Sequence, residues 1–252
     1  MIKASKLPPG PSKTSYMVKA KNARAMADAL AYTKGEAQPD AKGDAVDEVV
    51  ADGKAEAGMT AEATEAAREA RIGAAEIDIL EATPALGEDL TQIVNWAYRG
   101  KRGRQGWTGE MELLDGIRIA PDDMTKLLQA ATAGNDALRV FVAYMESQGV
   151  IGCVKVERVS AEEAEIGMFS VDPGMQSRGV GSLLLDKAER YAKQTLKVKR
   201  TSMMVLDVRE DLLAWYRRRG YVGTGAKEPF PTDANVGVPK RDLQFERYER
   251  AL

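Results

Sequence analysis

The sequence predicts an α/β protein built on a mixed, mostly antiparallel sheet that is flanked by helices. Short segments with alternating apolar and polar residues indicate half-buried strands, and longer segments with apolar residues at helical spacing indicate helices. Two β-rich segments, 137–146 and 149–160, are joined only by the turn-like Ser147-Gln148-Gly149. Because strands joined by so short a turn run antiparallel, the sheet is not purely parallel.

The predicted elements follow the order β-α-α-β-β-β-α-β-α-β-β from residue 74 onward. Residues 76–84 alternate as a strand does, and residues 85–100 form a helix that ends at Gly100. A second helix begins at Pro121, because proline is favoured at the first position of a helix. The remaining assignments are strands at 137–146, 149–160, 161–173 and 201–208, helices within 171–194 and at 211–220, and two final strands, the second within 240–252.

The composition excludes several classes of chemistry. The 252 residues include no histidine, which excludes a histidine general base, a Ser-His-Asp triad and a histidine-ligated metal. The single cysteine, Cys153, lies in a β-rich segment and fits a core position. A formal net charge of -2 argues against a chain that binds polyanions along its whole length. No apolar run approaches the roughly 20 residues that span a bilayer, so we expect an intracellular protein with no metal and no membrane contact.

Residues 1–73 differ in amino-acid composition from the rest of the chain. They are rich in alanine and poor in large aliphatic side chains, so they have little apolar surface to offset the entropy of ordering. We interpret them as a low-complexity, partly helical or disordered N-terminal extension, and residues 74–252 as a domain that folds without it. The basic, acid-poor stretch from Lys3 to Arg24 leaves a second interpretation open. According to this second interpretation, the extension either directs the protein from the cytoplasm to an organelle or binds a protein or ribonucleoprotein partner.

The segment 171–194 places a helix after a strand and a glycine-bearing turn, with no side chain suited to cap the helix. An uncapped helix N-terminus presents unpaired N–H groups and the positive end of the helix dipole, which together bind anions. Gly179 and Gly181 permit close approach of the backbone, and Arg178 and Ser182 offer further donors. The pattern predicts a phosphate-binding turn, although a tight strand-to-helix turn without a ligand has the same sequence.

Two motifs in this part of the chain resemble those of the GNAT acetyltransferase superfamily. The run "SVDPGMQSRGVGSLLLDKAERYA" is similar to the acetyl-CoA-binding signature Q/R-x-x-G-x-G/A, which it matches at Gln176, Gly179 and Gly181. The run "LDVREDLLAWYRRRGYVGTG" resembles the family's A-x-Y/F-x-x-x-G-F/Y helix, which it matches at Ala214, Tyr216, Gly220 and Tyr221. The resemblance covers about Glu76 to Leu252, and it departs at Asp211, where many members have asparagine.

The resemblance implies a GNAT-like fold and an acyl-CoA-dependent N-acyltransferase, with acetyl-CoA as co-substrate and a primary amine as acceptor. In this family the strands on either side of the phosphate-binding turn separate and admit the pantetheine arm, and the amine attacks the thioester directly in a ternary complex. The residues that the resemblance assigns to acetyl-CoA are Phe169, Ser170, Val171, Gln176, Ser177, Arg178, Gly179, Val180, Gly181, Ser182 and Asp211.

The resemblance also suggests the groups that move protons. Tyr216 occupies the position of the family's usual proton donor to the departing thiolate, and a tyrosine with its ordinary pKa of about 10 is protonated at neutral pH. The alternative is a tyrosine that only packs on the inner face of its helix. Glu165 and Glu110, with Glu112 beside the latter, are candidate bases for the acceptor ammonium, and each has the alternative of a surface carboxylate.

A second function stays open at this point. The GNAT-like fold could serve as a non-catalytic binding or structural subunit of a larger assembly such as a ribonucleoprotein, because a fold alone does not fix a function. The intact turn and Tyr216 favour the enzyme, whereas the long, charge-split N-terminal extension favours the assembly.

Overall fold

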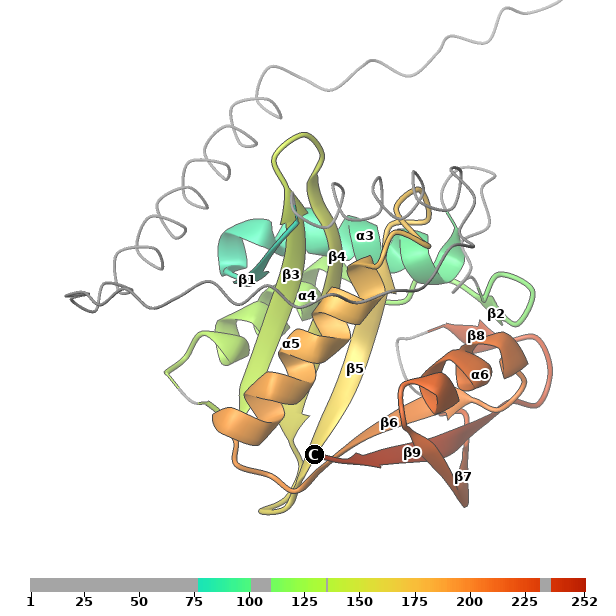
Figure 1. The fold of residues 1–252 in the computed structure, drawn as a ribbon. Helices are drawn as coiled ribbons and strands as arrows, with labels where there is room; N and C mark the ends of the chain where they lie inside the picture. Colours follow the sequence, from blue (N-terminus) through green and yellow to red (C-terminus); the bar gives the residue numbers. More distant parts are fainter. Residues whose placement is uncertain (1–76, 101–109, 135, 232–236) are drawn as a thin grey trace, which may run out of the picture. The chain divides into compact units, whose positions relative to one another are not determined.

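The computed structural model describes residues 77–100, 110–134, 136–231 and 237–252. The interpretation of residues 1–73 and the domain boundary at residue 74 lie outside these ranges. The described chain forms a seven-stranded sheet in the order β1-β3-β4-β5-β6-β9-β7 and a two-stranded ladder, β2-β8 (Figure 1). Within the seven-stranded sheet, β5 and β6 pair in parallel and all other neighbours pair antiparallel. The predicted fold class is therefore confirmed.

The long elements occur in the predicted order. The strands are β1 (Asp78–Glu81), β2 (Leu114–Asp115), β3 (Leu138–Met145), β4 (Gly149–Arg158), β5 (Glu163–Val171), β6 (Arg200–Leu206), β7 (Val222–Pro229), β8 (Val238–Pro239) and β9 (Gln244–Ala251). The helices are the 3-10 helix η1 (Pro84–Leu86), α3 (Gly87–Arg99), α4 (Pro121–Ala131), α5 (Val180–Gln194) and α6 (Glu210–Arg218). The sequence did not predict η1, β2 or β8, because elements of two or three residues are too short to show a periodicity.

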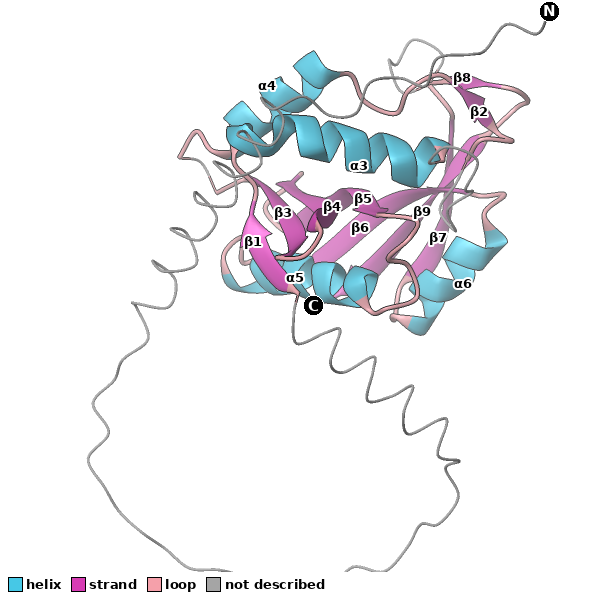
Figure 2. Cartoon of the chain, turned by 90° about the horizontal axis from the view of Figure 1, so that it is seen from above, coloured by secondary structure: helices cyan, strands magenta, loops and turns pink. Residues whose placement is uncertain are grey.

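The helices cover both faces of the sheet, with α3 and α4 on one face and α5 and α6 on the other (Figure 2). Helix α5 buries an apolar stripe at helical spacing, made up of Val180, Leu184, Leu185, Ala188 and Ala192. This stripe belongs to one core cluster with Phe141, Val154 and Val156 of the sheet. The packing fixes the start of α5 against the end of β5. None of the helices in the described ranges is long and apolar enough to cross a membrane.

Strands β5 and β6 separate along their length. Their parallel ladder ends at the pair Glu165–Ser202, although β5 continues to Val171 and β6 to Leu206. The two strands accordingly diverge toward their C-terminal ends (Figure 1). The sheet is therefore split in its middle, and the β5 main chain beyond Glu165 has lost its neighbour on that side, as the resemblance to the GNAT family implies.

A buried carboxylate, Glu163, ties the two strands together where they still pair. It accepts hydrogen bonds from Arg200 Nε and Nη2 at 3.0 and 2.9 Å and from the Ser202 hydroxyl at 2.5 Å. Arg247 on β9 donates a further hydrogen bond to it. Burial opposes the charge on Glu163, but these donors outweigh it and hold the pKa of the carboxyl below its usual value. The closed end of the split is thus fixed by an ionic cluster.

Strand β5 contains a β-bulge that no sequence pattern indicated. Its register with β4 shifts between Cys153 and Lys155, and Met168 has a φ of 48°. A methionine in the left-handed region is uncommon, and a bulge bends its strand and re-aims the neighbouring side chains. The bulge lies directly before Phe169, on the part of β5 that has separated from β6.

Candidate active site

A cavity of about 450 Å³ occupies the split between β5 and β6. Its walls come from these two strands, the turn and first residues of α5, helix α6, the C-terminal end of α3 and the segment that leads to α4. The predicted site residues that line it are Glu110, Glu165, Phe169, Val171, Gln176, Ser177, Gly179, Val180, Gly181, Ser182 and Tyr216. The fold therefore brings both motifs and both candidate bases to one place.

Three of the predicted site residues do not line the cavity. Ser170 is buried, and its hydroxyl donates a hydrogen bond to the Met168 carbonyl at 3.3 Å. Arg178 is exposed to solvent. Asp211 accepts hydrogen bonds from Arg209 Nε at 3.1 Å and Nη2 at 3.2 Å. A role for these three residues in acetyl-CoA binding stays a prediction.

At one end of the cavity, helix α5 begins without a side-chain cap. Gly179 occupies the N-cap position with a φ of 82°, and no side chain hydrogen-bonds to the start of the helix. Ser177, two residues earlier, is also in the left-handed region, with a φ of 65°. Gln176 Nε2 donates to the Val171 carbonyl at 3.3 Å and so holds the turn against the end of β5. The absence of a side-chain cap is confirmed, and an uncapped helix N-terminus offers unpaired amides and the positive end of the helix dipole to an anion.

Aromatic side chains line the middle of the cavity. The ring of Phe169 lies 5.9 Å from that of Trp215 and 6.4 Å from that of Tyr216, measured between centroids. Trp215 and Tyr216 themselves meet edge to face at 5.1 Å. These three rings join β5 to α6 across the split and give the middle of the cavity an apolar wall.

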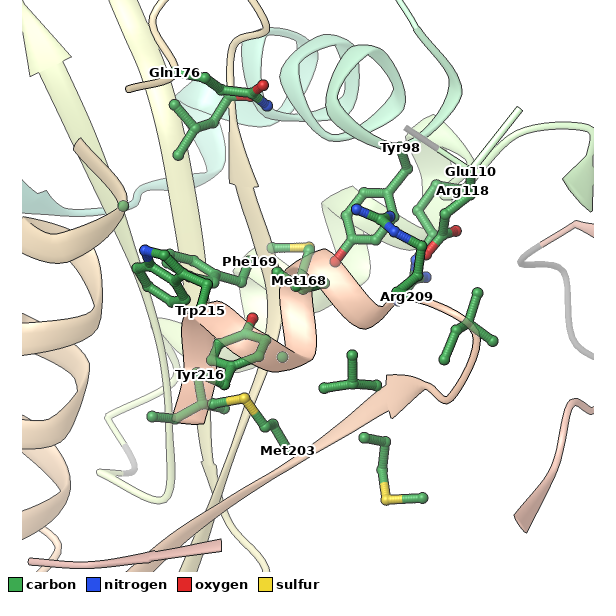
Figure 3. Close-up of a pocket in the computed structure, with 18 of the residues that line it drawn as sticks. Tyr98, Glu110, Arg118, Met168, Phe169, Gln176, Met203, Arg209, Trp215 and Tyr216 are labelled. Atoms are coloured by element: carbon green, nitrogen blue, oxygen red, sulfur yellow. The ribbon is translucent and has the colours of Figure 1, made fainter. Parts of the chain in front are cut away.

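The Tyr216 hydroxyl faces into this middle part of the cavity (Figure 3). No described residue hydrogen-bonds to it, and no fully buried polar side-chain atom in the described ranges lacks a partner, so the hydroxyl is open to the cavity. The side chain as a whole is only 5% exposed. Burial raises the pKa of Tyr216 well above its usual value, with smaller contributions from Tyr98 and Tyr221. The hydroxyl is therefore protonated throughout the neutral pH range.

The two candidate bases have different surroundings. Glu110 is nearly buried and pairs with Arg99, whose Nη1 lies 2.8 Å from Glu110 Oε2. Burial raises the pKa of Glu110, although Arg99 and Arg118 lower it in part. The Glu165 side chain is 35% exposed and lies 3.8 Å from Lys155 Nζ. Glu112 is exposed and does not line the cavity.

Three important lining residues were not identified from the sequence, namely Tyr98 on α3, Arg118 before α4 and Arg209 before α6. Together with Glu110 they gather on the side of the cavity away from Gln176 (Figure 3). Each belongs to a different segment, and none occupies a position that either motif specifies. The sequence run "GWTGEMELLDGIR", which contains both Glu110 and Arg118, is the pattern that could have indicated this side of the cavity.

Residues 136–223 match the family model described as "Acetyltransferase (GNAT) domain". Among solved structures, the chain is similar to a GNAT-family acetyltransferase from Streptococcus pneumoniae, with a TM-score of 0.53, 18% identity and coverage of 70% of this chain and 100% of that one. It is also similar to the spermidine/spermine N-acetyltransferase SpeG from Vibrio cholerae (TM-score 0.50, 14% identity, 71% of this chain and 94% of that one). A putative phosphinothricin N-acetyltransferase aligns with a TM-score of 0.50 and 16% identity, over 70% of this chain and 98% of that one.

A curated relative, the uncharacterized protein YdhI of Bacillus subtilis, is 30% identical over 86 residues, which are 34% of this chain. The chain spans about half of that relative, 51% of its length.

The split sheet, the uncapped helix N-terminus at its open end and Tyr216 beside the cavity are arranged as the resemblance to the GNAT family predicts. The match to the GNAT acetyltransferase family model covers residues 136–223, which include both motifs.

Proposed function

We propose that this protein transfers an acetyl group from acetyl-CoA to a primary amine, which attacks the thioester directly in a ternary complex. The observation that carries the proposal is that the uncapped N-terminus of α5 and the Tyr216 hydroxyl share one cavity. The family match supports the same class of reaction. The apolar middle of the cavity, between an anion-binding end and a charged end, fits a thioester placed between a pyrophosphate and an amine.

The residues of this chain bind acetyl-CoA along the open part of the split. The amides from Ser177 to Ser182 bind the pyrophosphate, since they combine a helix N-terminus with left-handed backbone at Ser177 and Gly179. The backbone of Phe169 and Val171 hydrogen-bonds to the pantetheine arm, because the ladder with β6 has ended before these residues. This placement sets the thioester beside Tyr216.

Proton transfer requires one acceptor and one donor. Glu110 removes a proton from the acceptor ammonium, directly or through a water molecule, and the neutral amine attacks the thioester carbon. As the carbon–sulfur bond breaks, Tyr216 donates its proton to the departing thiolate. The nitrogen releases a second proton as the amide forms, and this proton restores the tyrosine hydroxyl. Because burial disfavours a phenolate at Tyr216, the last two transfers are coupled.

We expect kcat/KM to depend on pH through the protonation of the proposed base, Glu110. A carboxylate acts as a base only when it is unprotonated, so activity falls as the pH drops through its pKa. Since burial raises the pKa of Glu110, this acid limb begins at a higher pH than it would for an exposed glutamate. Glu110→Gln is expected to remove the limb and lower the plateau by about 10²–10⁴-fold.

Glu165→Gln is the matched variant, since it neutralises a more exposed carboxylate of the same cavity. It is expected to retain both the limb and the plateau. Loss of the limb in Glu165→Gln and its persistence in Glu110→Gln would reverse the assignment of the base.

Thiol release from acetyl-CoA, followed with a panel of primary amines, tests the proposed function without a prior choice of acceptor. We expect thiol release that depends on the amine and exceeds hydrolysis in its absence. Calorimetric binding of CoA without turnover of any amine would instead support a non-catalytic subunit of a larger assembly. If the protein neither binds CoA nor releases thiol, the proposed function is wrong.

A further inference from the structure

The end of the cavity opposite the phosphate-binding turn is rich in positive charge. Three arginines line it, Arg99, Arg118 and Arg209. Two of them have carboxylate partners: Arg99 pairs with Glu110 at 2.8 Å, and Arg209 pairs with Asp211 at 3.1 Å. The third arginine, Arg118, has different surroundings.

Arg118 lines the cavity without an ion-pair partner among the described residues. Its guanidinium carbon lies over the ring of Tyr98, 5.1 Å from the centroid. The ring covers one face of the guanidinium, whereas the N–H groups along its edge are the part that binds an anion in the plane. A guanidinium held in this way is suited to pair with a carboxylate that enters the cavity.

The backbone beneath Arg118 is fixed. Arg118 N donates to Asn95 Oδ1 at 2.6 Å, and Asn95 Nδ2 donates to the Ile119 carbonyl at 2.9 Å. Ile119 N also donates to Asn95 Oδ1, at 3.3 Å, so one asparagine of α3 holds the peptide groups on both sides of Arg118. Together with the contact on Tyr98, it limits the rotation of the guanidinium before any ligand binds, which favours specific recognition.

Apolar side chains lie in the same part of the cavity. Phe230 and Phe245 stack with their centroids 5.4 Å apart, and both line the cavity. Leu114 and Leu206 belong to the same small apolar cluster and line it as well. An acceptor that fits this end has an apolar portion next to the group that meets Arg118.

We propose that the acceptor is an amine that also carries a carboxylate, of the class of apolar α-amino acids, and that Arg118 binds this carboxylate. The proposal rests on the proposed function and names its substrate class. Arg118 and Arg209 repel a second cationic group at this end, so a polyamine is disfavoured. Glu110 lies at the same end of the cavity as Arg118 (Figure 3), so a carboxylate on Arg118 brings the α-ammonium near the proposed base.

Binding to the full-length protein saturated with CoA tests the proposal, because CoA lacks the acetyl group and no turnover occurs. Calorimetry compares L-leucine, L-norleucine and L-phenylalanine with isopentylamine, 1-aminopentane and phenethylamine, which are the same molecules without the carboxylate. A further ligand, 1,5-diaminopentane, is 1-aminopentane with a second ammonium group, and it tests whether this end of the cavity disfavours a second cation. We expect at least one acid to bind about tenfold or more tightly than its matched amine, as one charge-assisted pair provides. Equal or weaker binding of every acid, undetectable binding included, overturns the proposal.

Arg118→Gln is expected to abolish the preference for the acid, and Arg118→Lys to retain part of it as a point charge. Arg190→Gln, on an exposed position of α5 outside the cavity, removes the same charge and is expected to leave the preference unchanged. A preference that survives in a folded Arg118→Gln protein overturns the assignment. Failure of the proposed function is distinguishable, because the protein would then neither bind CoA nor release thiol. Rapid acetylation of the amines with no preference for the acids would overturn only the proposal about the acceptor.

Discussion

Replacement of Gly179 by valine is expected to abolish CoA binding in a protein that still folds. Gly179 holds a φ of 82°, in a region that costs other L-residues about 1–2 kcal/mol and β-branched residues more. Valine therefore draws the turn out of this conformation, and the amides before α5 no longer converge on the pyrophosphate. Loss of two charge-assisted hydrogen bonds of about 1.5–3 kcal/mol each lowers affinity by at least about 10²-fold.

Gly149→Val provides the matched control for this substitution. Gly149 has a φ of 80° at the turn between β3 and β4, and, as at Gly179, an added Cβ would meet no atom within 4 Å. Both variants carry the same backbone strain, so both lose some stability, but only Gly179→Val is expected to lose CoA. Calorimetry on the two folded proteins measures the difference. Undiminished CoA affinity in Gly179→Val rules out this turn as the pyrophosphate site.

Tyr216→Phe is expected to lower kcat by about 10²–10⁴-fold, the usual contribution of a general acid, with little change in acetyl-CoA affinity. The variant keeps the ring and its contacts with Phe169, Trp215 and Tyr221, and it removes only the hydroxyl that opens into the cavity. Because the hydroxyl has no partner in the described protein, its loss leaves no buried donor unsatisfied. The folded state should therefore be as stable as before.

Tyr221→Phe gives the opposite pattern and serves as the control. The Tyr221 hydroxyl is outside the cavity and donates to Glu189 at 3.0 Å, with Thr201 Oγ1 also at 3.0 Å. Removing it is expected to lower the melting temperature and to leave kcat unchanged. Steady-state kinetics and thermal unfolding of both variants check the pair. An unchanged kcat in Tyr216→Phe assigns that residue to packing alone.

The uncapped start of α5 and the position of Tyr216 on its helix were predictable because local sequence determines them. The glycines and the absence of a cap are properties of a few consecutive residues, and Tyr216 sits at a fixed spacing within one helix. The order of the long strands and helices was predictable for the same reason, since periodicity shows within each segment.

The charged end of the cavity was not predictable in this way. Tyr98, Arg118 and Arg209 come from three segments that meet only in the folded chain, and an arginine before a helix has no signature of its own. The bulge at Met168 also has no local signal, because a methionine at positive φ is held there by the pairing of β5 with β4. The Asp211 carboxylate accepts a hydrogen bond from Arg209, and its role in acetyl-CoA binding stays a prediction.

The split between β5 and β6 makes the sheet two half-sheets, β1-β3-β4-β5 and β6-β9-β7, joined by a ladder that ends at Glu165–Ser202. The pantetheine arm of an acyl-CoA, bound as proposed, lies between the two half-sheets and hydrogen-bonds to the β5 main chain where the ladder with β6 has ended. A ligand that binds only the native state adds about 2.7 kcal/mol to the free energy of unfolding at a concentration one hundred times its Kd. An acyl-CoA bound in this way therefore stabilises the folded state in addition to serving as the co-substrate.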